Sequence, residues 1–352
     1  VNLPPITLLL LFAPFTVLSD LAGKLAYFAL NHATFLSGLA LLAWALRPPK
    51  RVVDTFLWTA AAIAAASAFE PWHDSLRLGQ QNGVVFFCLA ISAVATTRRQ
   101  DTLSGIFLAA ALIGKPSSAL LGIYFILARR WRTVIAAGAA GILAFAITLP
   151  WAGVENWRFY LMEKAPEILA GTPQQSNVAL LALHARLFLP SEALASFDAM
   201  PALPLAVAMT RAAQLLGLVA LWRLVTRCGR QQDSVTLSLE FAFTLVLSLS
   251  LVGHAWQSYL TWLVVAFVPL ADPRPWMALS PRVRRIALVL AAAAYASMAI
   301  NDVTLHRVTG STSWVAALFA SLPTLALLVL AFLLALLLRA HESTQEGAMF
   351  RN

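Results

Sequence analysis

The sequence predicts an all-α, polytopic integral membrane protein, and composition, apolar segments and the placement of basic residues each indicate this class. Of the 352 residues, 60% are hydrophobic and only 12% are charged, and the mean hydropathy is +0.77. Soluble domains carry about 25% charged residues. The composition therefore excludes an ordinary soluble globular protein.

Apolar segments long enough to be candidate membrane crossings recur along the chain. A hydrocarbon core about 30 Å thick is crossed by about 20 helical residues. The nine candidates lie at 24–46, 53–69, 82–97, 132–150, 203–226, 235–253, 257–271, 283–300 and 312–338. Two further apolar stretches, 5–17 and 102–128, are left over as re-entrant or interfacial helices. We treat 1–352 as one transmembrane domain, with 340–352 as a cytoplasmic tail.

The net charge of +9 is distributed by loop. Most of the 25 lysines and arginines lie in alternate connections, such as 47–51, 98–99 and 129–132, which the positive-inside rule assigns to the cytoplasm. This distribution orients the chain without any polyanion, so nucleic acid is not an expected partner. The two cysteines, Cys88 and Cys228, support neither a disulfide framework nor a metal site. No acidic cluster calls for a metal, and we expect no cofactor.

The stretch 102–128 predicts a hairpin that enters the membrane and turns back. The flanking sequences "TTRRQD" and "ARRWR" are both assigned to the cytoplasm, yet only one segment of single-span length separates them. Gly114 and Pro116 would break the helix at the tip, and Ser117 would cap the returning half. Lys115 would then join a positive helix end in an anion site. The alternative is a lysine that snorkels from an ordinary helix.

Polar residues on the outer side predict partners for this lysine. The loop at 69–84 contains "GQQN", in which Gly79 permits a tight turn while Gln80 and Asn82 offer amide groups to sugar hydroxyls or phosphate oxygens. The same loop carries Asp74. A polar loop that only caps a helix is the alternative interpretation.

Two more outer segments complete the predicted cavity. The stretch 151–202 reads as an outer loop or lid that starts with an interfacial helix, and its "PQQSN" precedes a short helix that carries His184 and Arg186. The segment 250–263 holds His254, which could bind phosphate as a cation or could simply lie in an interfacial aromatic belt.

In this order the motifs resemble glycosyltransferase family 87, the polyprenol-phosphate-dependent mannosyltransferases with the GT-C membrane fold. The matching series is "NLPPITLLLLFAPF" (2–15), "GQQN" (79–82), "GKPSS" (114–118), "PQQSN…ARLF" (173–188) and "GHAW" (253–256). The resemblance covers most of the chain. It implies a GT-C-like bundle, with Gln175 or Asn177 at the position of a family asparagine.

The resemblance also implies a reaction. An inverting transfer would move a sugar, which the resemblance implies is mannose, from a polyprenyl-phosphate donor to a lipid or glycan acceptor at the outer face of the cytoplasmic membrane. Lys115 and His254 would stabilise the leaving phosphate, and the remaining implied contacts to donor phosphate or sugar are Gln80, Asn82, Gln175, Asn177 and Arg186. The family's catalytic aspartate lies in a region that would precede Val1. Asp20 and Asp74 are outer carboxylates within the sequence, although neither lies at the family's catalytic position, and Asp74 is a candidate base.

Two other classes fit parts of the pattern. A lipid-linked transporter or flippase would also use a polar outer cavity and broken helices, although the two halves show no clear repeat. A structural membrane subunit would carry no chemistry. Glu240, in the middle of a span, would serve a proton pathway or an interhelical hydrogen bond, and Arg211 is a candidate partner for it.

Overall fold

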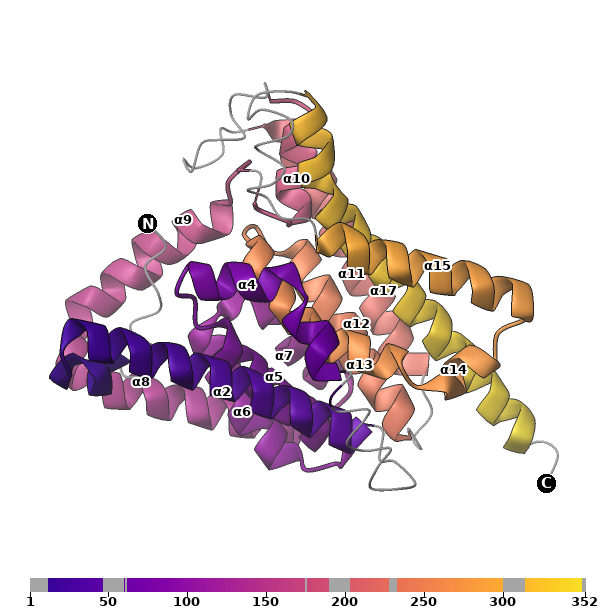
Figure 1. Ribbon diagram of the computed structural model, residues 1–352, viewed down its shortest axis with the longest axis horizontal. Helices are drawn as coiled ribbons and strands as arrows, with labels where there is room; N and C mark the ends of the chain where they lie inside the picture. Colours follow the sequence, from indigo (N-terminus) through magenta and orange to yellow (C-terminus); the bar gives the residue numbers. More distant parts are fainter. Residues whose placement is uncertain are drawn as a thin grey trace.

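The computed structural model describes residues 12–46, 60, 62–174, 176–189, 203–227, 233–299 and 314–349. In these ranges the regular structure is helical, apart from one isolated β-bridge between Asn177 and Trp256 (Figure 1). The all-α prediction is therefore confirmed.

Five described helices are long and apolar enough to cross a membrane. They cover Asp20–Ala45, Trp131–Lys164, Pro204–Thr226, Ser234–Leu251 and Ala317–Gln345. The predicted crossings at 82–97 and 257–271 form shorter apolar helices, and the one at 283–300 corresponds to α15 (Pro281–Met298), which is not among the five. The one at 53–69 lies partly outside the described residues, which include 60 and 62–69 of it. The chain is thus a multi-pass membrane protein, while the number nine stays a prediction.

Helix α12 (Ser234–Leu251) forms the centre of the bundle. Every residue from Val235 to Leu251 is buried, and α12 packs against α7 (Leu120–Leu127), α11 (Pro204–Arg227), α13 (Val264–Leu270) and α17 (Trp314–Met349). The α8 helix (Trp131–Phe159) instead exposes large apolar side chains, with Ile135 69% and Ile142 71% exposed. Such a surface is suited to lipid, since hydrocarbon tails can replace protein contacts.

The predicted turn-back at 102–128 is confirmed. Helix α6 (Asp101–Gly114) ends at Gly114, Lys115 is extended, and a 3-10 turn (Pro116–Ser118) leads into α7. The Arg130 side chain pairs with Asp101 at 2.9 Å and donates to the Thr96 carbonyl at 3.1 Å. The two basic turns that flank the hairpin therefore lie at the same end of the molecule.

The expected cap of the returning helix was wrong. The N-cap residue of α7 is Ala119, and no side chain caps it from that position. The Leu120 amide instead donates to Ser248 Oγ of α12 at 3.4 Å, and Ser248 Oγ donates to the Ser117 carbonyl at 2.6 Å. The capping hydroxyl therefore comes from Ser248 on the neighbouring helix α12, and not from Ser117 in the turn itself.

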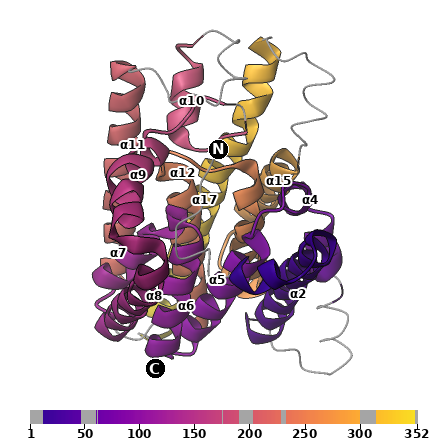
Figure 2. The same ribbon diagram turned by 90° about the vertical axis from the view of Figure 1, so that its left-hand side faces the viewer.

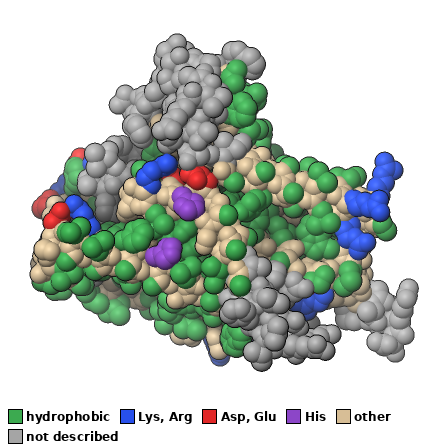
Figure 3. Space-filling model, in the orientation of Figure 1, with side chains coloured by type: hydrophobic (Ala, Val, Ile, Leu, Met, Phe, Trp, Pro, Cys, Tyr) green, Lys and Arg blue, Asp and Glu red, His purple; other side chains and the backbone are tan. Residues whose placement is uncertain are grey.

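Basic and mixed polar residues occupy different ends of the bundle. Figure 3 shows Lys and Arg gathered where α15 begins, whereas acidic, basic and histidine side chains share the face over α2 (Asp20–Leu46) and α4 (Glu70–Arg77). The positive-inside rule predicts that the first end is cytoplasmic, and we therefore call the second end the outer end.

The outer end is built from short and broken elements (Figures 1 and 2). Helix α8 kinks at Gly153, which has a φ of 74°, and continues through a π-helix (Tyr160–Lys164) into α9 (Ala165–Ala170). The predicted short helix after "PQQSN" is α10 (Leu180–Arg186). The remaining described elements are η2 (Ala13–Val17), α5 (Asn82–Thr97), η6 (Gln257–Leu263) and α14 (Pro273–Met277).

Candidate functional site

Lys115 lies at the centre of the polar cluster at the outer end. Its side-chain Nζ donates to Gln80 Oε1 at 2.8 Å and to the Tyr259 hydroxyl at 2.9 Å, and it lies 4.2 Å from the centroid of the Tyr259 ring. The residue is only 8% exposed. In the part of the chain that the structure describes, no carboxylate lies within ion-pair distance of Lys115.

This buried environment favours the neutral form of the Lys115 amine. Burial lowers the pKa of the Lys115 ammonium, in the turn between α6 and α7, from its usual value to about 7. Neutral acceptors satisfy the hydrogen-bond donors but do not offset the cost of burying a charge. An anionic ligand would do so. The site is therefore poised to gain a proton when an anion binds.

The "GQQN" turn is held against α2 and η6. Gly79 lies in the turn with a left-handed φ of 61°, which suits the expected tight turn. The Asn31 side chain of α2 donates to the Gln80 carbonyl at 2.9 Å and accepts from the Gly83 amide at 2.9 Å. Asn82 donates to the Ser258 carbonyl at 3.0 Å. These bonds fix the side of the turn that faces Lys115.

Asn82 retains one unused polar atom. Its Oδ1 is buried and has no hydrogen-bond partner in the part of the chain that the structure describes. An orphaned buried acceptor costs about 1–3 kcal/mol unless a ligand or water satisfies it. A hydroxyl or N–H donor on a ligand would fit this position.

His254 lies in the connection between α12 and η6, next to the hairpin tip. Ser117 Oγ donates to its carbonyl at 3.5 Å, and its ring packs edge-on to Trp256 at 4.3 Å between centroids. The ring Nε2 is buried and has no hydrogen-bond partner among the described residues. Burial, and then the nearby Lys115 charge, lowers the pKa of His254 to about 4. The imidazole is therefore neutral at pH 7, and the expected cation is replaced by a neutral ring that can offer one N–H.

Asn177 joins the "PQQSN" segment to the "GHAW" turn. Its side-chain amide donates to the carbonyls of Thr172 and Gly253, and its Oδ1 accepts from the amides of Ala179 and Ala255. These four bonds all go to backbone groups. In this arrangement Asn177 organises the outer wall of the site, and its predicted contact with a donor stays a prediction.

Arg186 is buried beneath the same segment. Its guanidinium donates to the carbonyls of Gln174, Asn177 and Ala320 at 2.6–2.9 Å. It therefore ties α10 to α17, and a role in donor binding stays a prediction. Gln175 lies outside the described residues.

Asp74 lies on α4, where it pairs with Arg77 at 2.6 Å. The α4 helix itself packs on η6, so it covers the element that carries Tyr259. Trp72 anchors α4 by stacking on Phe35 of α2, with ring centroids 3.9 Å apart. Asp74 thus belongs to the outer end, and its role as base stays a prediction.

Sequence reasoning missed Asn31, did not predict the contact between Tyr259 and Lys115, and misjudged one pair. Asn31 could have been noticed as a polar residue inside an apolar span, whereas the partnership of Tyr259 with Lys115 has no local signal. The hydroxyl of Tyr124 donates to Glu240 at 2.9 Å, and Arg211 instead donates to Gln214 at 2.9 Å. Arg211 is therefore not the partner of Glu240.

Among the described residues, no cluster of three His, Cys, Asp or Glu could hold a metal.

The fold and the site define a multi-pass helical membrane protein with a buried lysine beneath a polar outer surface. The sequence model for glycosyltransferase family 87 matches residues 3–252. The chain belongs to this family and is a membrane glycosyltransferase that uses a sugar donor and an acceptor. No curated protein and no solved structure matches the chain.

Proposed function

We propose that this glycosyltransferase moves a sugar from a polyprenyl-phosphate donor to a lipid or glycan acceptor at the outer face of the cytoplasmic membrane. One observation carries the proposal: Lys115 is a buried amine in a helix break, its hydrogen-bond acceptors among the described residues are neutral, and it lies at the end of the bundle opposite the basic loops. Such a position calls for a ligand that is both anionic and lipid-borne, because the surrounding helices are apolar.

The site residues divide into chemical roles. Lys115 pairs with the phosphate that joins the sugar to the lipid, and it stabilises the charge that grows on the leaving phosphate. The neutral His254 ring donates a hydrogen bond to a phosphate oxygen. Asn82 Oδ1 accepts from a sugar hydroxyl, and Gln80 keeps the ammonium in place.

The bond changes follow an inverting displacement. The acceptor hydroxyl loses its proton to a carboxylate, for which Asp74 is the candidate within this sequence, and its oxygen attacks the anomeric carbon. The bond from that carbon to the phosphate oxygen breaks, and the polyprenyl phosphate leaves with the electron pair. Mannose is the sugar that the family resemblance favours, and a GT-C arrangement is the fold that it favours.

The test is donor choice by the purified protein in lipid vesicles. We expect transfer from a polyprenyl-phosphate sugar and no transfer from a sugar nucleotide, with an acceptor extract from the same membrane. Direct use of the nucleotide donor would contradict the proposal. Movement of intact donor lipid across the vesicle, without transfer of its sugar, would instead support the transporter or flippase alternative.

A further inference from the structure

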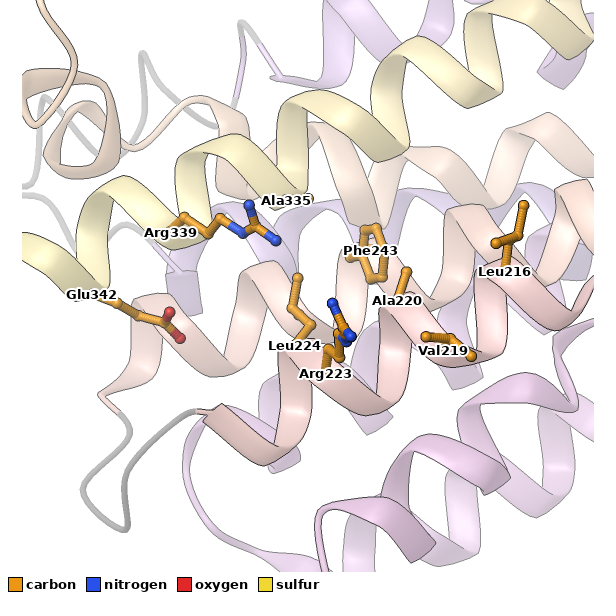
Figure 4. A pocket seen from close by; sticks show the side chains of 9 residues that line it. All are labelled: Leu216, Val219, Ala220, Arg223, Leu224, Phe243, Ala335, Arg339 and Glu342. Atoms are coloured by element: carbon orange, nitrogen blue, oxygen red, sulfur yellow. The ribbon is translucent and has the colours of Figure 1, made fainter. Parts of the chain in front are cut away.

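A groove lies away from Lys115, at the end of the bundle that the positive-inside rule predicts to be cytoplasmic. The groove has a volume of about 280 Å³ and opens between α11 and α17, with α12 as its floor (Figure 4). Apolar residues line most of it, namely Leu216, Val219, Ala220, Leu224, Phe243 and Ala335. The remaining lining residues are Arg223, Arg339 and Glu342.

The lining changes character along the groove. Leu216 is 69% exposed and Val219 39% exposed on α11, so the apolar part is open to the bilayer, while Phe243 is buried at its floor. Figure 4 shows Arg223 and Arg339 projecting from opposite helices into the space between them. Glu342 follows Arg339 by three residues on α17 and lies beyond both arginines in the same view.

This order matches the chemistry of one class of membrane lipid. A glycerophospholipid with an amino headgroup presents an acyl chain, then a phosphate, then an ammonium. Two guanidinium groups suit the phosphate, since arginine binds phosphate oxygens through several N–H groups. A carboxylate one helical turn further suits the ammonium. Basic sites between membrane helices at the cytoplasmic side are known to take lipid headgroups.

We propose that this groove binds one aminophospholipid of the inner leaflet, of the phosphatidylethanolamine type. Its acyl chain lies on Leu216, Val219 and Ala220, its phosphate between Arg223 and Arg339, and its ammonium against Glu342. The proposal is independent of the proposed function, because none of these residues belongs to the outer site.

The experiment measures binding of three lipids to the delipidated full chain in detergent. Phosphatidylethanolamine, phosphatidylcholine and phosphatidylglycerol are titrated separately, with native mass spectrometry and thermal unfolding as readouts. We expect phosphatidylethanolamine to bind most tightly, since quaternary choline offers no N–H to Glu342 and phosphatidylglycerol offers no cation. Equal affinity for the three lipids would overturn the proposal.

Variants assign the binding to the groove. Arg223→Gln with Arg339→Gln should weaken phosphatidylethanolamine binding by about tenfold or more, and Glu342→Gln should remove the preference over phosphatidylglycerol. Arg132→Gln is the matched control, because Arg132 is an exposed arginine at the same end but outside the groove. An equal loss in Arg132→Gln would mean general attraction to charge and would overturn the site.

Two further measurements test whether the groove binds a whole lipid or only a small soluble anion. Ala220→Trp leaves both arginines in place but occupies the apolar part, so it should abolish lipid binding. Glycerophosphoethanolamine, the soluble headgroup alone, should not raise the melting temperature of the unaltered protein. Unchanged lipid binding in Ala220→Trp, or full stabilisation by the soluble headgroup, would contradict the acyl-chain position.

Discussion

At the residue scale, substitutions of Lys115 should change the rate of sugar transfer without lowering the stability of the fold. Lys115→Met keeps the aliphatic stem and removes a buried charge, so the fold should be retained. Loss of a charge-assisted contact worth about 1.5–3 kcal/mol should lower sugar transfer roughly ten- to a hundredfold. Lys115→Arg should restore part of the rate, because a planar guanidinium does not reproduce a compact ammonium. Rates measured at matched thermal stability test this, and a normal rate in a well-folded Lys115→Met would contradict the phosphate role.

The pKa of Lys115 gives the reaction a pH dependence of known sign. The free protein loses the Lys115 proton above about pH 7, and bound phosphate raises the pKa. The kcat/KM for the donor should therefore fall as pH rises above 7, while kcat at saturating donor holds to higher pH. His254, with a pKa of about 4, should add no step above pH 6. Steady-state profiles between pH 6 and 9 measure this, and a fall that persists in Lys115→Met would assign it to another group.

At the level of elements, the close approach between the outer segment and the "GHAW" turn requires a glycine at position 171. Gly171 has a φ of 76°, and a Cβ there would lie 2.4 Å from the Gly253 carbonyl oxygen. Gly171→Ala should therefore destabilise the protein by about 1–3 kcal/mol and displace the segment that Asn177 anchors. Gly138→Ala on α8 is the control, since a Cβ there meets no atom within 4 Å and alanine favours a helix. Thermal unfolding compares them, and equal melting temperatures would refute the close approach.

At the scale of the whole molecule, the hairpin requires both basic turns to face the same compartment. In a variant without native cysteines, single cysteines at Arg99 and Arg129 should react only with reagent applied from the cytoplasmic side. One at Leu78, which is 57% exposed at the outer end, should react from outside. Labelling of oriented membranes with an impermeant maleimide tests this. Opposite sidedness of Arg99 and Arg129 would be incompatible with the Arg130–Asp101 pair.

The sequence by itself determined the class of this protein and predicts its orientation, because hydropathy and the placement of arginine depend on the bilayer and not on a partner helix. It also located the helix break at Lys115, since Gly114 and Pro116 act through local backbone geometry. Only the tertiary structure decided what Lys115 touches. Tyr259 is 144 residues away along the chain, and Asn31 reaches the Gln80 turn across 49 residues. Likewise, Ser248 and not Ser117 accepts from the first amide of the returning helix, and backbone carbonyls accept from Arg186. Packing brings these groups together from distant parts of the chain, so no local sequence pattern predicts the contacts.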